Sequence, residues 1–170
     1  MKNLKICILC FTTFCFFTTN AQTDKEYFER GSNKLTLRDY YGAIEDFDKA
    51  VRYNSNHFNA YNNRGICKYN LKDYKRAIED FDKAIEINPD YLDAYYNRSL
   101  ARFMLEDYKG VIEDIDKMID SKPKFADAYY LRGLAEIGLG QNDDGCMDLK
   151  KAAELGLLKA LADVRTYCNP

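Results

Sequence analysis

The chain repeats itself at a spacing of 34 residues, four times and without an insertion. Three residue types recur in register: Tyr27, Tyr61, Tyr95 and Tyr129; Leu37, Leu71, Leu105 and Leu139; Lys49, Lys83, Lys117 and Lys151. Self-similarity at a short fixed period is typical of solenoids, whose units bury apolar surface only by stacking on their neighbours. The period therefore predicts an elongated stack of units and directs attention to a long binding surface.

Each unit contains two helical patterns, which are clearest in residues 58–91. Apolar and small residues recur at helical spacing in both halves of this unit: Ala60, Tyr61, Gly65, Ile66 and Tyr69, then Tyr74, Ile78, Phe81 and Ile85. Asp73 stands between the halves, where its carboxylate can accept hydrogen bonds from the first backbone N–H groups of the second helix. Asp39 and Asp107 repeat this arrangement, and Gln141 departs from it.

Prolines and small residues complete the helical assignment. Pro89 and Pro123 follow the second helix of their units, because proline cannot continue a helix. The predicted helices are 24–37, 40–53, 58–71, 74–87, 92–105, 108–121, 126–139 and 142–155, with one further helix over 157–168. Small residues are expected where the paired helices touch, with Gly31, Gly65 and Gly133 facing Ala43, Ala77 and Gly145.

Six residues of the second unit carry a family resemblance: Tyr61, Gly65, Tyr74, Ala77, Ala84 and Pro89. In this order and spacing they resemble the tetratricopeptide repeat family, with Tyr in place of the more usual Trp, and the resemblance covers residues 24–159. It implies an all-α fold, a right-handed α-solenoid of four helix-turn-helix units over 22–156 and a C-terminal capping helix and tail over 157–170. The expected units are approximately 24–57, 58–91, 92–125 and 126–156.

The first 21 residues differ from the repeats and have the pattern of a secretory signal peptide. Lys2 and Lys5 precede an apolar run from Ile6 to Phe17, and a small-residue end leads to Ala21. The run falls short of the roughly 20 apolar residues that span a bilayer. We therefore expect cleavage after Ala21, no stable membrane insertion after the signal is removed, and a periplasmic, cell-envelope or secreted location.

Three cysteines remain after the signal: Cys67, Cys146 and Cys168. Gly156 permits a sharp turn between the helices that carry Cys146 and Cys168. At about 1.5 Å per residue, both arms bring their cysteines to a similar height, and an exported protein meets oxidising conditions. The sequence therefore predicts a Cys146–Cys168 disulfide and a buried free thiol at Cys67, with three unpaired buried thiols as the alternative.

Arginine and aspartate recur in every unit at reciprocal positions: Arg30, Arg64, Arg98 and Arg132; Asp46, Asp80, Asp114 and Asp148. In an antiparallel helix pair hinged near Asp73, Arg64 and Asp80 lie at about the same height. One interpretation is a row of guanidinium groups for an acidic ligand. The fourfold recurrence instead favours structural ion pairs within each unit, since planar guanidinium groups suit carboxylates.

A stripe on the first helix of each unit is expected to face the concave groove, by resemblance to the family. The candidate groove residues are Asn59, Asn62, Asn63, Ile66, Tyr69, Asn70, Asp93, Tyr96, Asn97, Leu100, Phe103 and Tyr130. The resemblance implies that Asn63 and Asn97 hold the backbone of a peptide ligand, because an amide donates and accepts hydrogen bonds at once. The alternative is a solvated polar face. The Lys and Arg pairs with which some family members clamp a terminal carboxylate are not matched.

Several function classes find no support in the sequence. His57 is the only histidine, and after the predicted signal peptide no catalytic carboxylate pair, CxxC element or Gly-rich phosphate loop indicates a catalytic, cofactor or metal site. The formal net charge is −2 and the charges are interspersed, which argues against a nucleic-acid partner. We expect a non-catalytic scaffold that binds a peptide segment of another protein. The alternatives are a structural subunit of an envelope or secreted assembly and a glycan- or peptidoglycan-binding module.

Overall fold

The computed structural model describes residues 24–168, and the predicted signal peptide lies outside these residues. The described part is helical with short connections and contains no strand. A helix over 24–36 precedes eight labelled helices: α2 (Tyr40–Tyr53), α3 (Phe58–Asn70), α4 (Tyr74–Ile87), α5 (Leu92–Phe103), α6 (Tyr108–Ser121), α7 (Ala126–Gly138), α8 (Asn142–Glu154) and α9 (Leu158–Tyr167). Of these described helices, none is long and apolar enough to cross a bilayer.

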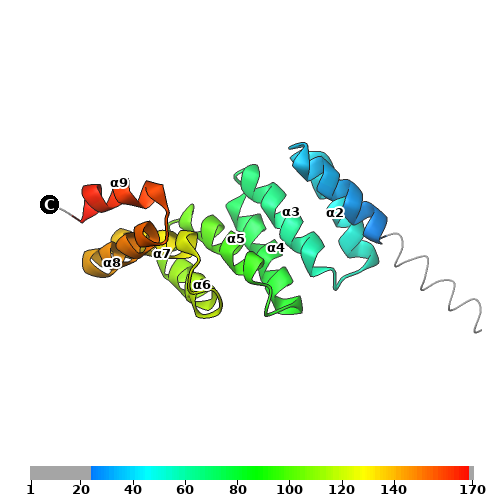
Figure 1. Cartoon of the computed structure of the whole chain (residues 1–170). Coiled ribbons are helices and arrows are strands. Elements are labelled where there is room, and N and C mark those ends of the chain that lie inside the picture. Colours follow the sequence, from blue (N-terminus) through cyan, green and yellow to red (C-terminus); the bar gives the residue numbers. More distant parts are fainter. Residues whose placement is uncertain (1–23, 169–170) are drawn as a thin grey trace, which may run out of the picture.

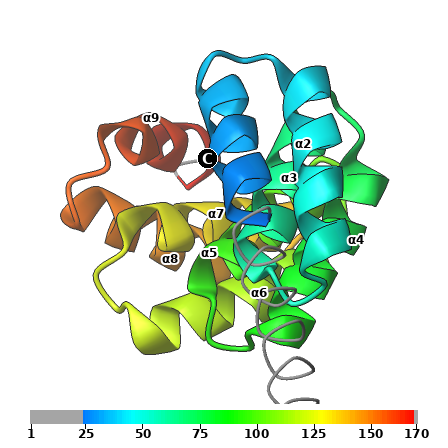
Figure 2. The ribbon, with the colours of Figure 1, turned by 90° about the vertical axis from the view of Figure 1, so that its right-hand side faces the viewer.

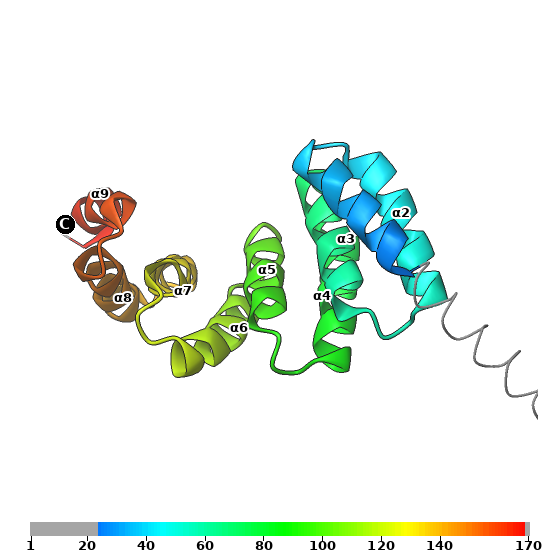
Figure 3. The same cartoon turned by 45° about the vertical axis from the view of Figure 1, so that its right-hand side comes forward.

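The helices stack in pairs as an all-α solenoid (Figure 1). In Figure 3, α5, α7 and α9 lie along the inner side of an arc, while α6 and α8 lie along its outer side. The end view in Figure 2 shows that successive pairs turn about the long axis of the molecule. The first helices of the third and fourth units, α5 and α7, therefore lie on the concave side, where the family resemblance placed them.

Aspartate side chains mark the start of the second helix in three units. The carboxylates of Asp39, Asp73 and Asp107 accept hydrogen bonds from backbone N–H groups in the first turns of α2, α4 and α6. Gln141 makes no such side-chain bond at the start of α8. His57 has the same capping role at α3, where its Nδ1 accepts a hydrogen bond from the N–H of Ala60 at 3.3 Å. The single histidine thus has a local structural role.

The first helix of each unit ends one or two residues earlier than predicted, because a tight turn follows it. In the second unit, the N–H of Asp73 donates to the carbonyl of Lys68 and the N–H of Lys72 donates to that of Tyr69, both at 2.9 Å. This pair of backbone hydrogen bonds requires a residue in the left-handed backbone conformation directly after the helix. The residues in that conformation are Arg38, Lys72, Glu106 and Gly140, with φ of 61°, 62°, 60° and 78°.

Aromatic rings, rather than alanines, fill the space beside two of the small residues. A Cβ on Gly65 would lie 2.6 Å from Cε1 of Phe81, and a Cβ on Gly31 would lie 2.9 Å from the equivalent atom of Phe47. The nearest neighbours of Gly31 and Gly65 are therefore the rings of Phe47 and Phe81. Only in the fourth unit, where Leu149 replaces Phe, do Gly133 and Gly145 meet backbone to backbone.

Candidate functional site

Two neighbouring hollows lie on the concave side of the second and third units. The wide hollow, of about 460 Å³, is lined by Asn62, Asn63, Ile66, Tyr91, Asp93, Tyr96, Asn97, Met118, Lys122 and Phe125. The small hollow, of about 200 Å³, is lined by Ile66, Tyr69, Asn70, Phe81, Asn97 and Leu100. Ile66 and Asn97 border both hollows, so the two form one continuous surface, called the groove below.

Three asparagine amides form a hydrogen-bonded relay across the wide hollow. Nδ2 of Asn97 on α5 donates to Oδ1 of Asn62 on α3 at 2.9 Å. Nδ2 of Asn62 then donates to Oδ1 of Asn63 at 3.3 Å. Within the described residues, Nδ2 of Asn63 and Oδ1 of Asn97 make no further hydrogen bond. The relay therefore presents a donor at one end and an acceptor at the other.

The rings of Tyr91, Tyr96 and Phe125 also line the wide hollow and are called the aromatic wall below. Tyr96 and Phe125 pack edge to face with ring centroids 5.4 Å apart, and Tyr91 packs in the same way on Phe58 at 5.0 Å. Burial raises the pKa of Tyr96 and of Tyr91, so both hydroxyl groups stay neutral near pH 7. The groove thus combines an apolar wall with a few neutral polar groups, the composition that ligand sites commonly have.

Three of the predicted groove residues do not line the hollows. Asn59 lies one turn before the relay, and Phe103 packs edge to face on Tyr108 in the core between α5 and α6. Tyr130 donates its hydroxyl to Asp163 of α9 at 2.8 Å, with the ammonium of Lys159 4.2 Å from its ring centroid. Tyr130 is therefore engaged within the protein, because the capping helix packs beside it.

Sequence reasoning missed four residues of the wide hollow: Tyr91, Met118, Lys122 and Phe125. They come from the connections between units and from the outer helix α6. The prediction followed the first helices alone. Three of them, Tyr91, Lys122 and Phe125, stand in the connections between units beside Asp90 and Pro123, and this place in the repeat could have indicated them.

The arginine register makes the predicted ion pairs and a second set besides. Arg64 donates through Nε and Nη2 to Asp80 of its own unit at 3.0 and 2.6 Å. Its Nη1 donates to Asp48 of the preceding unit at 2.6 Å. Arg98 bonds in this way to Asp114 and Asp82, and Arg132 to Asp148 and Asp116. Each of these arginines therefore joins two units, and none is free for an acidic ligand.

Burial and charge act in opposite directions on these guanidinium groups. Burial alone would lower the pKa of Arg64, but its hydrogen bonds with Asp80 and Asp48 outweigh that effect and raise the pKa. The first unit differs, since Arg30 bonds to Asp46 but its side chain is 53% exposed. Hydrogen bonding from Arg30 holds the pKa of Asp46 down at about 2.

A second cation supports the buried aspartate in three units, and the fourth unit breaks this rule. Lys34, Lys68 and Arg102 pair with Asp46, Asp80 and Asp114. The same register in α7 holds Glu136. Its Oε2 is buried and has no hydrogen-bond partner within the described part of the chain. Burial and the neighbouring charge of Asp148 raise the pKa of Glu136 to about 7.

The structure joins Cys146 and Cys168 in a disulfide, with Cα atoms 5.6 Å apart. The bond fastens α9 to α8. Cys67 is a buried free cysteine, and burial raises the pKa of its thiol to about 12. The thiol therefore stays protonated and unreactive near pH 7. Across residues 24–168, no group of three or more His, Cys, Asp and Glu side chains is arranged to hold a metal ion.

Known proteins with this architecture place the chain in a family. Tetratricopeptide repeat models match residues 27–57 and 58–91. No curated protein sequence matches the chain. Among solved structures, a MamA crystal structure is 28% identical with a TM-score of 0.76, and the match covers 85% of each chain. MamA 41-end from Desulfovibrio magneticus RS-1 is 25% identical with a TM-score of 0.77, over 86% of this chain and 89% of that one.

A third structure carries a bound peptide. It is the first TPR of Spaghetti (RPAP3) bound to the HSP90 peptide SRMEEVD, 23% identical with a TM-score of 0.68, over 70% of this chain and 94% of that one. At this identity the likeness concerns the fold alone. The repeated helix pairs, the small residues between them and the two matched segments agree with one another. The chain therefore belongs to the tetratricopeptide repeat family.

Proposed function

We propose that the protein is a non-catalytic interaction scaffold that binds an extended peptide segment of a partner protein in the groove. The observation that carries this proposal is the asparagine relay, whose open donor on Asn63 and open acceptor on Asn97 match the C=O and N–H groups of a peptide backbone. Side chains of such a segment would contact the aromatic wall and the small hollow.

The geometry favours binding over chemistry. The polar groups that line the two hollows are mostly neutral amides and tyrosines, while Asp93 and Lys122 supply the charges. Backbone-directed amides hold a chain independently of its sequence, and the apolar hollows select among side chains. The proposed ligand is therefore a segment of protein rather than a small substrate.

The test uses a displayed library of random 12-residue linear peptides, selected on the protein with its disulfide intact. Replacing Asn63 and Asn97 together with Ala removes both ends of the relay. Each lost hydrogen bond costs on the order of 1 kcal/mol, so the dissociation constants of selected peptides should rise tenfold or more. Asn59→Ala is the matched control, because it removes an amide from the same helix outside the hollows. Equal affinity of the double variant and the control would contradict groove binding.

We also propose that the protein is exported. The proposal is supported by the signal-peptide pattern of residues 1–21 and by the Cys146–Cys168 disulfide, since disulfides persist mainly in oxidising compartments. N-terminal sequencing of protein recovered outside the cytoplasm is expected to begin at Gln22. A recovered chain that still carries Met1 would contradict cleavage.

A further inference from the structure

Helix α9 stands where the first helix of a fifth unit would stand. It begins at Leu158, two residues earlier than the 34-residue period sets after Ala126. With that offset, the fully buried Ala160 takes the place of Ala60, Ala94 and Ala128, which are also fully buried. The hydrogen bond between Tyr130 and Asp163 occurs at the position of the one between Asn62 and Asn97. The described chain thus ends in half a unit.

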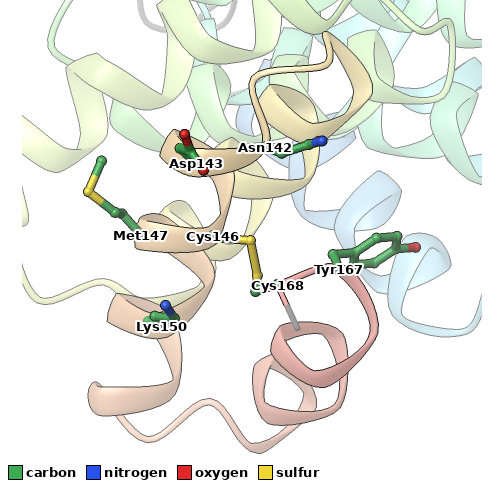
Figure 4. Close-up of a pocket in the computed structure, with 7 residues that line it drawn as sticks. All are labelled: Asn142, Asp143, Cys146, Met147, Lys150, Tyr167 and Cys168. Carbon is green, nitrogen blue, oxygen red and sulfur yellow. A yellow bond between two sulfur atoms is a disulfide. The ribbon is translucent and has the colours of Figure 1, made fainter. Parts of the chain in front are cut away.

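The side of α9 on which a second helix would pack is open and partly apolar. Leu161 is 46% exposed and Tyr167 is 49% exposed. Two hollows of about 520 and 390 Å³ lie along the junction of α8 and α9, and Lys150 lines both. Figure 4 shows the larger one, with Met147 and Lys150 on α8 and Tyr167 beside the disulfide. These two hollows form the terminal slot, whose lining includes Asp143, Met147, Lys150, Glu154, Leu161 and Val164.

The residues of the slot depart from the pattern of the inner units. Met147 is 62% exposed, yet its register holds exposed glutamates in α2, α4 and α6. Lys150 occupies the register of Asp48, Asp82 and Asp116, the carboxylates that receive the next unit's arginine. Val164 stands in that arginine's place. An apolar side chain and a cation that pairs with no carboxylate among residues 24–168 have therefore replaced the acidic groups that mark this surface elsewhere.

We infer that the terminal slot binds an amphipathic α-helix of a partner protein, which completes the fifth unit. Helices α3, α5 and α7 each pack on the second helix of their own unit, so the slot continues an interface that the solenoid already repeats. The Cys146–Cys168 disulfide holds α9 on α8 and keeps the slot in shape. The partner helix carries an apolar stripe toward Leu161 and Val164 and an acidic residue opposite Lys150. Asp143 and Glu154, at either end, favour basic residues at the helix termini.

The experiment selects displayed 14-residue amphipathic helices, the length of α2, α4 and α6, on the oxidised protein. The selected helices should share an apolar stripe with an Asp or Glu beside it. Leu161→Asp and Met147→Glu should each weaken their binding tenfold or more, and both positions are exposed enough for the fold to persist. Leu37→Asp is the control, because Leu37 is 79% exposed at the far end of the solenoid. Lys150→Glu should weaken binding, and a helix whose acid is changed to Lys should recover it.

Three results would overturn the inference. One is a selection without an apolar stripe. Another is binding that Leu161→Asp leaves unchanged. The third is a dimer in sedimentation velocity that Leu161→Asp dissociates, since the slot would then hold a second copy of this chain. The Asn63→Ala/Asn97→Ala variant separates this site from the groove, because it should leave helix binding unchanged.

Discussion

Arg64 and its equivalents in α5 and α7 each join two neighbouring units through ion pairs. The Arg64 side chain is only 15% exposed, and it binds the buried Asp80 and the more exposed Asp48 at once. Removing the guanidinium leaves Asp80 with Lys68 alone. We expect Arg64→Leu to lower the free energy of unfolding by about 2 kcal/mol, less than for a buried carboxylate left wholly unpaired.

The measurement is urea unfolding followed by circular dichroism. Arg30→Leu is the control, because Arg30 is half exposed and bonds to one aspartate. Its effect should be smaller than that of Arg64→Leu, because the Arg30 side chain is largely exposed and Asp46 keeps Lys34 as a partner. A melting temperature that rises in Arg64→Leu would show that the arginine is kept for a ligand instead.

Glu136 is the residue at which the charge pattern of the repeats fails. Its pKa of about 7 lies above the ordinary value of 4.5, so the folded protein holds a proton that the unfolded chain releases. Stability should therefore fall as the pH rises from about 4.5 to 7. Glu136→Lys restores the cation found at Lys68 and should raise the free energy of unfolding at pH 8 by about 1 kcal/mol.

Glu136→Gln distinguishes the effect of the buried negative charge from the effect of the missing cation, because it removes the charge without adding a cation. This variant should be more stable than the parent at pH 8 and similar to it at pH 4.5. Thermal unfolding at the two pH values decides the matter. Equal melting temperatures for parent and Glu136→Gln at pH 8 would mean that the carboxylate is well solvated.

The sequence predicted the ion pairs within each unit but not those between units. Arg64 and Asp80 lie 16 residues apart, and their recurrence indicated a pair within the unit. Asp48 also lies 16 residues from Arg64, on the other side, and recurs as Asp82 and Asp116. It was missed because contact between units depends on how one helix pair lies on the next. The relay that engages Asn97 with Asn62 was missed for the same reason.

The turns between the two helices of the first three units contain residues with a strained backbone conformation. Lys72 adopts φ of 62°, where a side chain costs roughly 1 kcal/mol or more, and Gly140 occupies the same register at 78°. Lys72→Gly should be neutral or stabilising by up to about 1 kcal/mol, because the relief of strain is partly offset by the greater freedom of the unfolded chain. Gly140→Ala should destabilise by about 1 kcal/mol.

Differential scanning calorimetry of both variants measures these effects. Gly140 has open space at its Cβ position, so any loss in Gly140→Ala reports the backbone alone. A destabilised Lys72→Gly together with an unchanged Gly140→Ala would contradict the assignment of the cost to the turn.

The predicted starts of α2 to α8 agree with the structure, whereas the first helices of the units end early. Starts follow from side chains close in sequence, such as Asp73, whose carboxylate caps α4. Ends depend on the left-handed turn, which three of the four units build without glycine and which therefore leaves no marker. The groove was predicted to a similar extent. Its lining residues on α3 and α5 follow the helical period, but Met118 comes from α6 and Phe125 from the connection before α7, which that period does not indicate.

For the whole molecule, the disulfide is the main restraint on the C-terminal end. It closes a loop with a sequence separation of 22 residues and should stabilise the capping helix by about 3 kcal/mol in the chain-entropy account. Cys146→Ala/Cys168→Ala should therefore lower the melting temperature and increase hydrogen exchange in α9 before α3 or α5.

Thiol titration of the unfolded, unreduced protein checks the bond itself. One free thiol per chain, from Cys67, is the expected result. Three free thiols would contradict the disulfide. Cys67→Ala is the control, since it should abolish the remaining thiol signal and leave the exchange of α9 unchanged.

Arg64 and Arg98 each bond to aspartates of two neighbouring units, and this has a consequence for the length of the molecule. Consider a second copy of residues 58–91 inserted after Tyr91. Its copy of Arg64 would pair with Asp82 of the preceding unit and with the copy of Asp80 in its own unit. The copy of Asp82 in the inserted segment would in turn accept the hydrogen bond from Arg98. The middle of the chain is thus modular, and such an extension should yield a longer, more heat-resistant rod in small-angle scattering and calorimetry. If the same segment were inserted after α8, its arginine would lie opposite Lys150 and would have no carboxylate to pair with in the preceding unit. The ion pairs between units therefore allow an added repeat in the interior but not after α8.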